Sequence, residues 1–110
     1  MVTIELNEYR DNVFAVNFDT DEYISEDLRN GSEPFQIAYY VRLFENASDV
    51  SFVEHKEMIF SEHYAYTYNG IPFSMVVDPD DKVISHFTVD NPSDREAIAE
   101  MIKNLIEASK

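Results

Sequence analysis

The stretch Glu62–Ile84, EHYAYTYNGIPFSMVVDPDDKVI, contains the features that decide how the rest of the chain is interpreted. Phe73–Val77 is a continuous apolar run of the kind that forms a buried strand. Pro79–Lys82 is typical of a turn, and Val83–Val89 alternates apolar and polar residues as a half-exposed strand does. Pro72 needs an explanation, because a proline in a central strand lacks the N–H that a neighbouring strand would accept. It is tolerated if it occupies the first residue of its strand.

Upstream of this stretch the hydrophobic pattern alternates between strands and helices. Short apolar runs predict strands, whereas apolar residues at helical spacing and a proline at a first helical position predict helices. The predicted strands are Val2–Leu6, Asn12–Phe18 and Val50–Val53. The predicted helices are Asp21–Arg29, a helix that begins at Pro34 and ends at Asn46–Asp49, and Glu57–Tyr66.

The C-terminal segment carries the clearest helical signature in the chain. Ser93 and Glu96 have the spacing of a capping box, and Pro92 lies just ahead of them. An apolar stripe at helical spacing follows, consisting of Ile98, Met101, Ile102, Leu105 and Ile106. An amphipathic helix of this kind needs a sheet to cover.

The predicted order is therefore strand, strand, helix, strand, helix, strand, strand, helix. Strands joined through helices are expected to run parallel, and the last two strands, joined by a tight turn, are expected to run antiparallel. This order predicts an α/β fold in which helices flank a central mixed β-sheet and an amphipathic helix ends the chain. With 110 residues, the chain is expected to form a single domain over residues 1–110.

Charge is the strongest global feature of the chain. It carries 22 acidic and 8 basic residues, a net charge of −14, which repels phosphate backbones and anionic membranes and attracts basic partners. We therefore expect no direct nucleic-acid binding and no membrane association. The acids are densest in the segment DTDEYISED, which contains Asp19, Asp21, Glu22, Glu26 and Asp27. This acidic segment is either a solvated loop that keeps the protein soluble or a surface that binds a basic partner.

Composition excludes or disfavours several kinds of chemistry. The chain has no cysteine, which excludes disulfides, thiolate metal sites and thiol catalysis by this chain alone. His55, His63 and His86 lack the spacing of a metal site, and Asp78–Asp81 lacks the glycine and distal glutamate of a calcium loop. We expect no metal and no cofactor. The first residues lack the pattern of a secretory signal, which favours a cytoplasmic location.

The segments GIPFSMVVDPDDKVISHF (70–87) and SDREAIAEMIKNLIEA (93–108) resemble the C-terminal half of thioredoxin-like domains. In that superfamily an Ile-Pro pair with a cis proline opens an antiparallel strand, and an amphipathic helix closes the domain. The resemblance implies a thioredoxin-like fold over nearly the whole chain, with Pro72 in the cis form. It also places Ser32 to Phe35 where the family has Cys-Gly-Pro-Cys, and Val16 to Phe18 where it has Val-Asp-Phe.

Departures from the family pattern imply a redox-inactive member. Ser32 and Phe35 occupy the two cysteine positions, and a serine hydroxyl forms no disulfide. Asn17 stands in place of the family's buried acid and cannot act as a base. A glutathione-transferase-like role for Ser32 would need a helical domain and a nearby base, neither of which the chain provides. We therefore expect no enzymatic activity.

The resemblance implies a protein-interaction module, and the net charge of −14 favours a partner protein with a basic surface. The family's substrate groove maps onto the helix-start loop at Ser32–Phe35, the Ile71–Pro72 turn, and Thr88 and Val89 before the last helix. The first two segments are predicted to meet the acidic segment at one end of the sheet. The predicted partner-binding residues are Ser32, Glu33, Pro34, Phe35, Ile71 and Pro72, together with Asp19, Asp21, Glu22, Glu26 and Asp27. The alternative is an acidic inhibitor, immunity-type protein or nucleic-acid mimic that caps a basic partner. Mimicry requires carboxylates gathered on one face at phosphate-like spacing.

Overall fold

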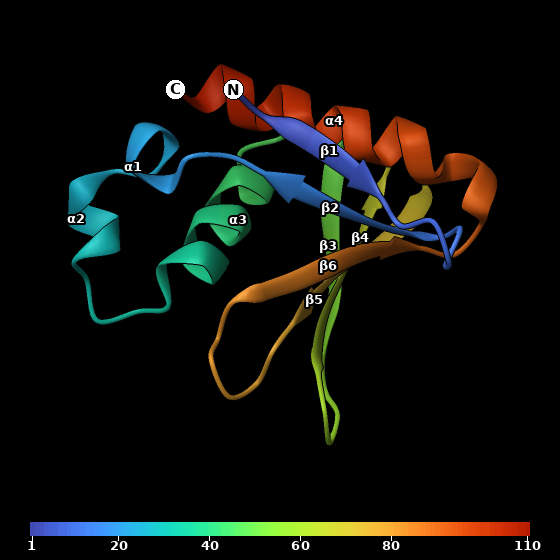
Figure 1. Cartoon of the computed structure of the whole chain (residues 1–110), viewed down its shortest axis with the longest axis horizontal. Helices are drawn as coiled ribbons and strands as arrows, with labels where there is room; N and C mark the ends of the chain where they lie inside the picture. Colours follow the sequence, from blue (N-terminus) through green and yellow to red (C-terminus); the bar gives the residue numbers. More distant parts are fainter.

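A six-stranded antiparallel sheet organises the computed structural model, which describes all 110 residues (Figure 1). The strand order is β1-β2-β6-β5-β4-β3, and every neighbouring pair is antiparallel. The strands are β1 (Thr3–Leu6), β2 (Val13–Asn17), β3 (Val50–Glu57), β4 (Glu62–Tyr68), β5 (Ile71–Val77) and β6 (Ile84–Val89). The predicted thioredoxin-like α/β fold with a mixed sheet is therefore wrong, and the protein has a mostly β fold.

The expected parallel pairing fails because of where the chain goes after β2. Helix α3 (Phe35–Glu45) carries the chain to the opposite edge of the sheet, where β3 begins. Strand β3 runs in the same direction as β2, but β4, β5 and β6 lie between the two. The chain then returns as a meander of four antiparallel strands until β6 pairs with β2. The two strands joined through the helix therefore run in the same direction, as expected, but they are not neighbours in the sheet.

The predicted helix at Glu57–Tyr66 is also wrong, because these residues form the end of β3, a tight connection and most of β4. Tyr64, Tyr66 and Tyr68 alternate along β4, so their rings lie on one face of the sheet. The chain then reverses through Asn69 and Gly70, whose φ angles are 48° and 83°. Positive φ at both central residues is the requirement of a type I′ turn, which an Asn-Gly pair meets.

The same hairpin explains the proline in a central strand. Pro72 faces Thr67 of β4, whereas the pairing of β5 with β6 begins one residue later, at Phe73 and Val89. No strand therefore faces Pro72 on the β6 side, and the missing N–H leaves no acceptor unpaired. The backbone contains no cis peptide bond, so the expectation of a cis Pro72 is wrong.

Two long helices and three single turns complete the fold. Helix α3 begins after Pro34 and ends at Asn46, close to the prediction. The predicted Asp21–Arg29 helix is split into α1 (Thr20–Tyr23) and α2 (Glu26–Arg29). Helix α4 (Arg95–Ser109) follows a short 3-10 turn, η1 (Pro92–Asp94). None of these helices combines the length and the hydrophobicity that crossing a bilayer requires.

The start of α4 differs from the predicted capping box. Asn91, rather than Ser93, provides the cap, because its side chain accepts the N–H of Ser93. Arg95 then reaches back to the β1–β2 loop, where its Nη1 donates to the carbonyl oxygens of Asn7 and Arg10 at 3.0 and 3.2 Å. One guanidinium therefore connects the last helix to the first hairpin, about 85 residues away in sequence. Because the donor is charged, these hydrogen bonds are stronger than neutral ones.

The core lies between the two long helices and one face of the sheet. Phe14 and Phe87 stack across β2 and β6 with ring centroids 5.4 Å apart, and Phe44 of α3 meets Tyr66 edge-on at 4.8 Å. The predicted stripe of α4 faces this core, and Ile102 is completely buried. The opposite face of the sheet carries partly exposed small or polar side chains, including Ala65, Ser74 and Thr88, together with the buried Val13 and Val76.

Ile102→Asp is expected to destabilise the protein by more than about 3 kcal/mol, because it places a charge without a partner in the core. Chemical denaturation followed by circular dichroism measures this loss. Asn104→Asp is the matched control, since it adds the same charge to an exposed position of α4. Equal stability of the two variants would contradict the position given to α4.

Gly70→Ala is expected to lower the stability by about 1 kcal/mol, because a positive φ is strained for alanine but not for glycine. No atom lies within 4 Å of the added Cβ, so the loss reports backbone conformation alone. Gly31→Ala is the control, because its Cβ would make only an ordinary contact, 3.4 Å from the carbonyl oxygen of Leu28. If both variants unfold at the same denaturant concentration, Gly70 does not set the turn.

Candidate functional site

The β3–β4 hairpin exposes an unusual amount of apolar surface. Nine large hydrophobic side chains are exposed in the whole chain, and five of them lie within residues 52–60. They are Phe52, Val53, Met58, Ile59 and Phe60, of which Ile59 and Phe60 are 87% and 89% exposed. Figure 1 shows this hairpin projecting away from the helices, beyond the rest of the sheet. They form two groups, at residues 52–53 and 58–60, and exposed apolar patches are typical of interaction surfaces.

Strand β3 is also a free sheet edge. It pairs only with β4, and its other side meets no strand. With eight residues it is twice as long as β1, the strand at the opposite edge. A bulge at Val53 and the charged residues Glu54, Lys56 and Glu57 interrupt it. Such features discourage indiscriminate strand pairing, so a partner of this edge must complement the charges.

An apolar groove of about 480 Å³ lies beside this edge, between α3 and the hairpin. Its floor contains Tyr64 and Tyr66 of β4, and Val41 and Phe44 of α3 form its wall. Phe52 of β3 packs edge-on against Tyr66, with ring centroids 5.5 Å apart. The remaining lining residues are Glu45, Val50 and His55. The groove, the free edge and the exposed tip follow one another along the same hairpin, and together we call them the hairpin surface.

An ion pair with a buried carboxylate lies at the last residue pair of the hairpin, next to its tip. Glu62 is only 6% exposed, and its Oε2 accepts a hydrogen bond of 2.9 Å from Lys82 Nζ. Glu57 faces Glu62 directly across the strands, an unfavourable pair of like charges. His55, Glu57 and Glu62 could together offer ligand atoms to a metal ion, since these atoms lie within 4.8 Å of one another. Lys82 already neutralises Glu62, however, so the cluster is best described as an ion pair.

Lys82→Met is expected to lower the melting temperature, because it leaves the buried Glu62 carboxylate without its closest cation. The hydrogen bond to Glu62 raises the pKa of Lys82 above its ordinary value of 10.5. The stabilisation is therefore complete below that value and is lost as the pH rises through the raised pKa. The difference in melting temperature between wild type and variant should accordingly shrink from neutral to strongly alkaline pH.

Lys56→Met is the matched control for this experiment. Lys56 forms an ion pair of 3.1 Å with Glu54, and both side chains are well exposed. Exposed pairs contribute little, so this variant should melt close to the wild type. If Lys82→Met and Lys56→Met melted alike at neutral pH, the assignment of Glu62 as a buried charge would be wrong.

The residues predicted as a binding site do not come together. Pro34 lines a groove with Glu62 and Lys82, and Glu62 pairs with Val77, the last residue of β5. Ile71 and Pro72 are the first residues of that strand. Six residue steps along a strand span about 20 Å. Ser32 to Phe35 therefore lie near one end of β5, and Ile71 and Pro72 lie at the other.

Three of the five acids in the acidic segment have structural partners. Asp19 caps α1 by accepting the N–H of Asp21 at 2.9 Å. Asp21 in turn pairs with Arg29 at 3.0 Å. Glu22 pairs with Lys110 at the end of the chain, and the hydrogen bond from Lys110 lowers the pKa of Glu22. The Glu22 contact therefore holds the segment against the end of the chain, whereas the Asp19 and Asp21 contacts lie within the segment and α2.

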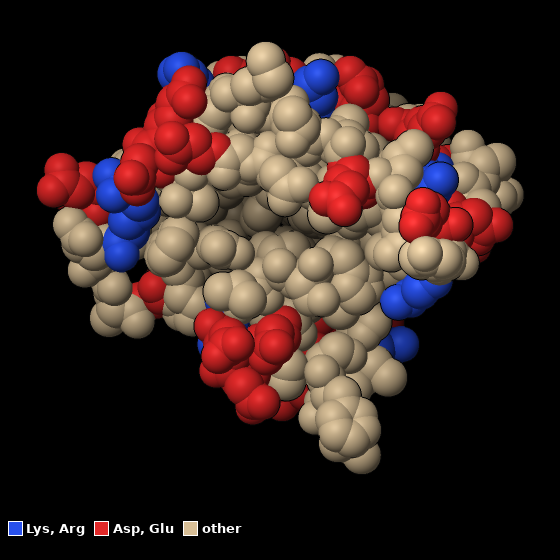
Figure 2. Space-filling model, in the orientation of Figure 1, with Lys and Arg blue, Asp and Glu red and all other residues tan.

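Glu26 and Asp27 are the two remaining acids, and they lie in the first turn of α2 without an ion pair. Figure 2 shows that the acidic side chains on this face form separate groups around a centre without charge. On this face the carboxylates are therefore not gathered into one patch.

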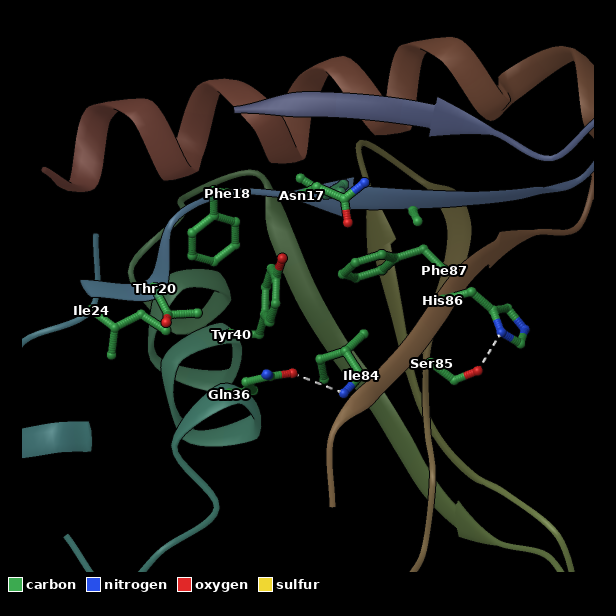
Figure 3. Close-up of a pocket in the computed structure, with 12 residues that line it drawn as sticks. Asn17, Phe18, Thr20, Ile24, Gln36, Tyr40, Ile84, Ser85, His86 and Phe87 are labelled. Atoms are coloured by element: carbon green, nitrogen blue, oxygen red, sulfur yellow. Dashed lines mark hydrogen bonds between the residues drawn. The ribbon is translucent and has the colours of Figure 1, made fainter. Parts of the chain in front are cut away.

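A second concave site lies where β2 and β6 diverge (Figure 3). These strands pair only through Val13 with Thr88 and Phe14 with Phe87. Beyond these pairs the strands separate, and the N–H of Ile84, in β6, has no partner on β2. Gln36 of α3 replaces that partner, because its Oε1 accepts the Ile84 N–H at 3.1 Å. The cleft is therefore a stable interruption of the sheet.

Comparison with protein-family models, curated proteins and solved structures finds no match to this chain. Sequence reasoning missed the hairpin surface, because it assigned Glu57–Tyr66 to a helix. The Asn69–Gly70 turn signal, preceded by alternating tyrosines, could have identified β4 and with it the exposed residues Ile59 and Phe60.

Proposed function

We propose that this protein acts by binding another protein, with the hairpin surface as its contact and a basic surface on the partner. The concentration of exposed apolar residues at Phe52–Phe60 is the observation that carries the proposal. Removing Ile59 and Phe60 from water would contribute favourably to association, since apolar burial is the main driving force in most protein complexes.

Charge around the hairpin favours a basic partner. Glu45 lines the groove, and Glu54 and Glu57 lie on the free edge. Lys56 is the only basic residue in the hairpin. With a net charge of −14, a second copy of the chain would be repelled, whereas a basic partner would be attracted over long range.

Backbone groups of β3 add a way of recognising an extended segment. A strand placed beside β3 would continue the sheet, and its alternate side chains would face the apolar groove. Lysine or arginine residues in the same segment would meet Glu54 and Glu57. An extended basic segment with alternating apolar residues is therefore the partner chemistry that matches this surface.

The proposal is tested with three matched baits in affinity capture from a native lysate. Wild type is compared with an Ile59→Ser/Phe60→Ser variant and with Tyr9→Ser, which removes an equally exposed aromatic ring from the β1–β2 loop. We expect a partner to be retained by wild type and by Tyr9→Ser and lost from the hairpin variant. It should have a basic isoelectric point and be released as the salt concentration rises.

Mass spectrometry of the bound fractions measures this outcome. If the three baits retain the same proteins, the hairpin is not the contact. Retention that depends on the hairpin but withstands high salt would contradict the basic character of the partner.

A further inference from the structure

The cleft between β2 and β6 contains features of a ligand site that the hairpin surface does not share. It has a volume of about 250 Å³ and lies where Figure 2 shows a hollow in the uncharged centre of the surface. Four elements line it, namely β2, α1, α3 and β6. Figure 3 shows the rings of Phe18, Tyr40 and Phe87 around the opening, whereas the ring of His86 points away.

Tyr40 provides the strongest indication of a ligand. The residue is only 3% exposed, yet its hydroxyl makes no hydrogen bond within the protein. No completely buried side-chain nitrogen or oxygen lacks a partner, so this hydroxyl is reached from the cleft. A nearly buried polar group without a protein partner is rare, because its desolvation costs free energy unless something binds it.

The contrast with Tyr39 shows that the open hydroxyl is specific to the cleft. Tyr39 is the next residue in α3, and its hydroxyl lies 2.8 Å from Ser109 Oγ. Burial raises the pKa of Tyr40, so its hydroxyl stays protonated at neutral pH and can both donate and accept a hydrogen bond.

The lining favours an uncharged aromatic ligand. Tyr40 lies edge-on to Phe87 at 5.2 Å and to Phe18 at 6.3 Å. The rings of Tyr40 and Phe87 are nearly buried, so Phe18, which is partly exposed, offers the aromatic surface that a ligand can contact. The lining contains no Lys, Arg, Asp or Glu. A charged ligand would therefore lose its hydration without gaining an opposite charge. The net charge of −14 opposes anions further.

We propose that the cleft between β2 and β6 binds a small, uncharged aromatic compound whose hydrogen-bonding substituent pairs with the hydroxyl of Tyr40. A cavity of about 150 Å³ lined by apolar side chains already holds benzene, so the cleft has room for one ring system with a substituent. Gln36 and Thr20 offer further polar atoms at the wall of the cleft. The inference does not depend on the hairpin surface and would hold if the proposed function failed.

The test uses phenol, toluene and benzoate, which share one ring and differ in the group it carries. Binding is followed by shifts of the backbone amide signals in two-dimensional NMR of the ¹⁵N-labelled protein. Phenol at millimolar concentration is expected to shift the amide signals of Val16, Ile84 and Phe87. The amide signals of the groove between α3 and the hairpin should stay unchanged. Toluene should bind more weakly than phenol, and benzoate weaker still by at least about tenfold.

Tyr40→Phe isolates the hydroxyl, because it removes one oxygen that no protein group uses. The variant should melt at the same temperature as the wild type. It should bind phenol about fivefold more weakly and bind toluene with unchanged affinity. Tyr39→Phe is the matched control, since it removes a hydroxyl from the neighbouring residue outside the cleft, and it should bind phenol normally.

Three results would overturn the proposal. The first is that phenol shifts no amide signal of the cleft, or shifts only those of the groove between α3 and the hairpin. The second is equal phenol affinity in wild type and Tyr40→Phe, and the third is benzoate binding as tightly as phenol. If Tyr40→Phe failed to fold, the shift map and the comparison of phenol with benzoate on the wild type would still decide the question.

Discussion

The register between β4 and β5 is the constraint on which the rest of this structure depends. It is set by the two-residue turn at Asn69 and Gly70, whose positive φ angles allow only one alignment of the two strands. In that alignment Tyr66 stacks on Phe73 at 5.6 Å, and both face the helices. A shift by one residue would turn these rings toward the solvent and bring Thr67 and Ser74 into the core. The position of Glu62 beside Val77, near Lys82, follows from the same register.

The two candidate sites arise in different parts of the strand order, one at its β3 end and the other between β2 and β6, for different reasons. Strand β3 is the last strand of the meander, and nothing covers its outer edge or the tip at Ile59 and Phe60. The cleft arises where the meander meets the first hairpin, because β2 and β6 share only two residue pairs before they separate. Helix α3 contributes to both, through Phe44 in the groove and Tyr40 in the cleft. One helix therefore lines both the free edge and the gap between β2 and β6.

Charge has two roles in this protein. Within the acidic segment, Asp19 and Asp21 cap and brace short helices that contain no buried residue. Around the hairpin, Glu54 and Glu57 place negative charge on the free edge, which in the proposed complex would attract a basic segment and disfavour another copy of the same chain. The cleft lining, by contrast, carries no charged side chain at all. The two sites are thus suited to partners of different chemistry.

Elements with a strong local signal were predictable from the sequence. The stripe from Ile98 to Ile106 determined α4 and the face it buries, and the apolar run at Phe73–Val77 determined β5. The absence of cysteine and the net charge of −14 bounded the chemistry without any structure. The segment around Ile59 and Phe60 was misread because an apolar run at an exposed hairpin tip resembles one side of a buried helix.

Strand adjacency was decided only by the tertiary structure. Val13 meets Thr88, and Tyr40 meets Phe87, although these partners are far apart in the chain. Helix and turn propensities act over a few neighbouring residues, whereas the choice of strand neighbours depends on burying one face of all six strands at once. The direction of β3 followed from the connecting helix, but its place at the far edge did not. Both candidate sites depend on that place and on the separation of β2 from β6, which no local pattern encodes.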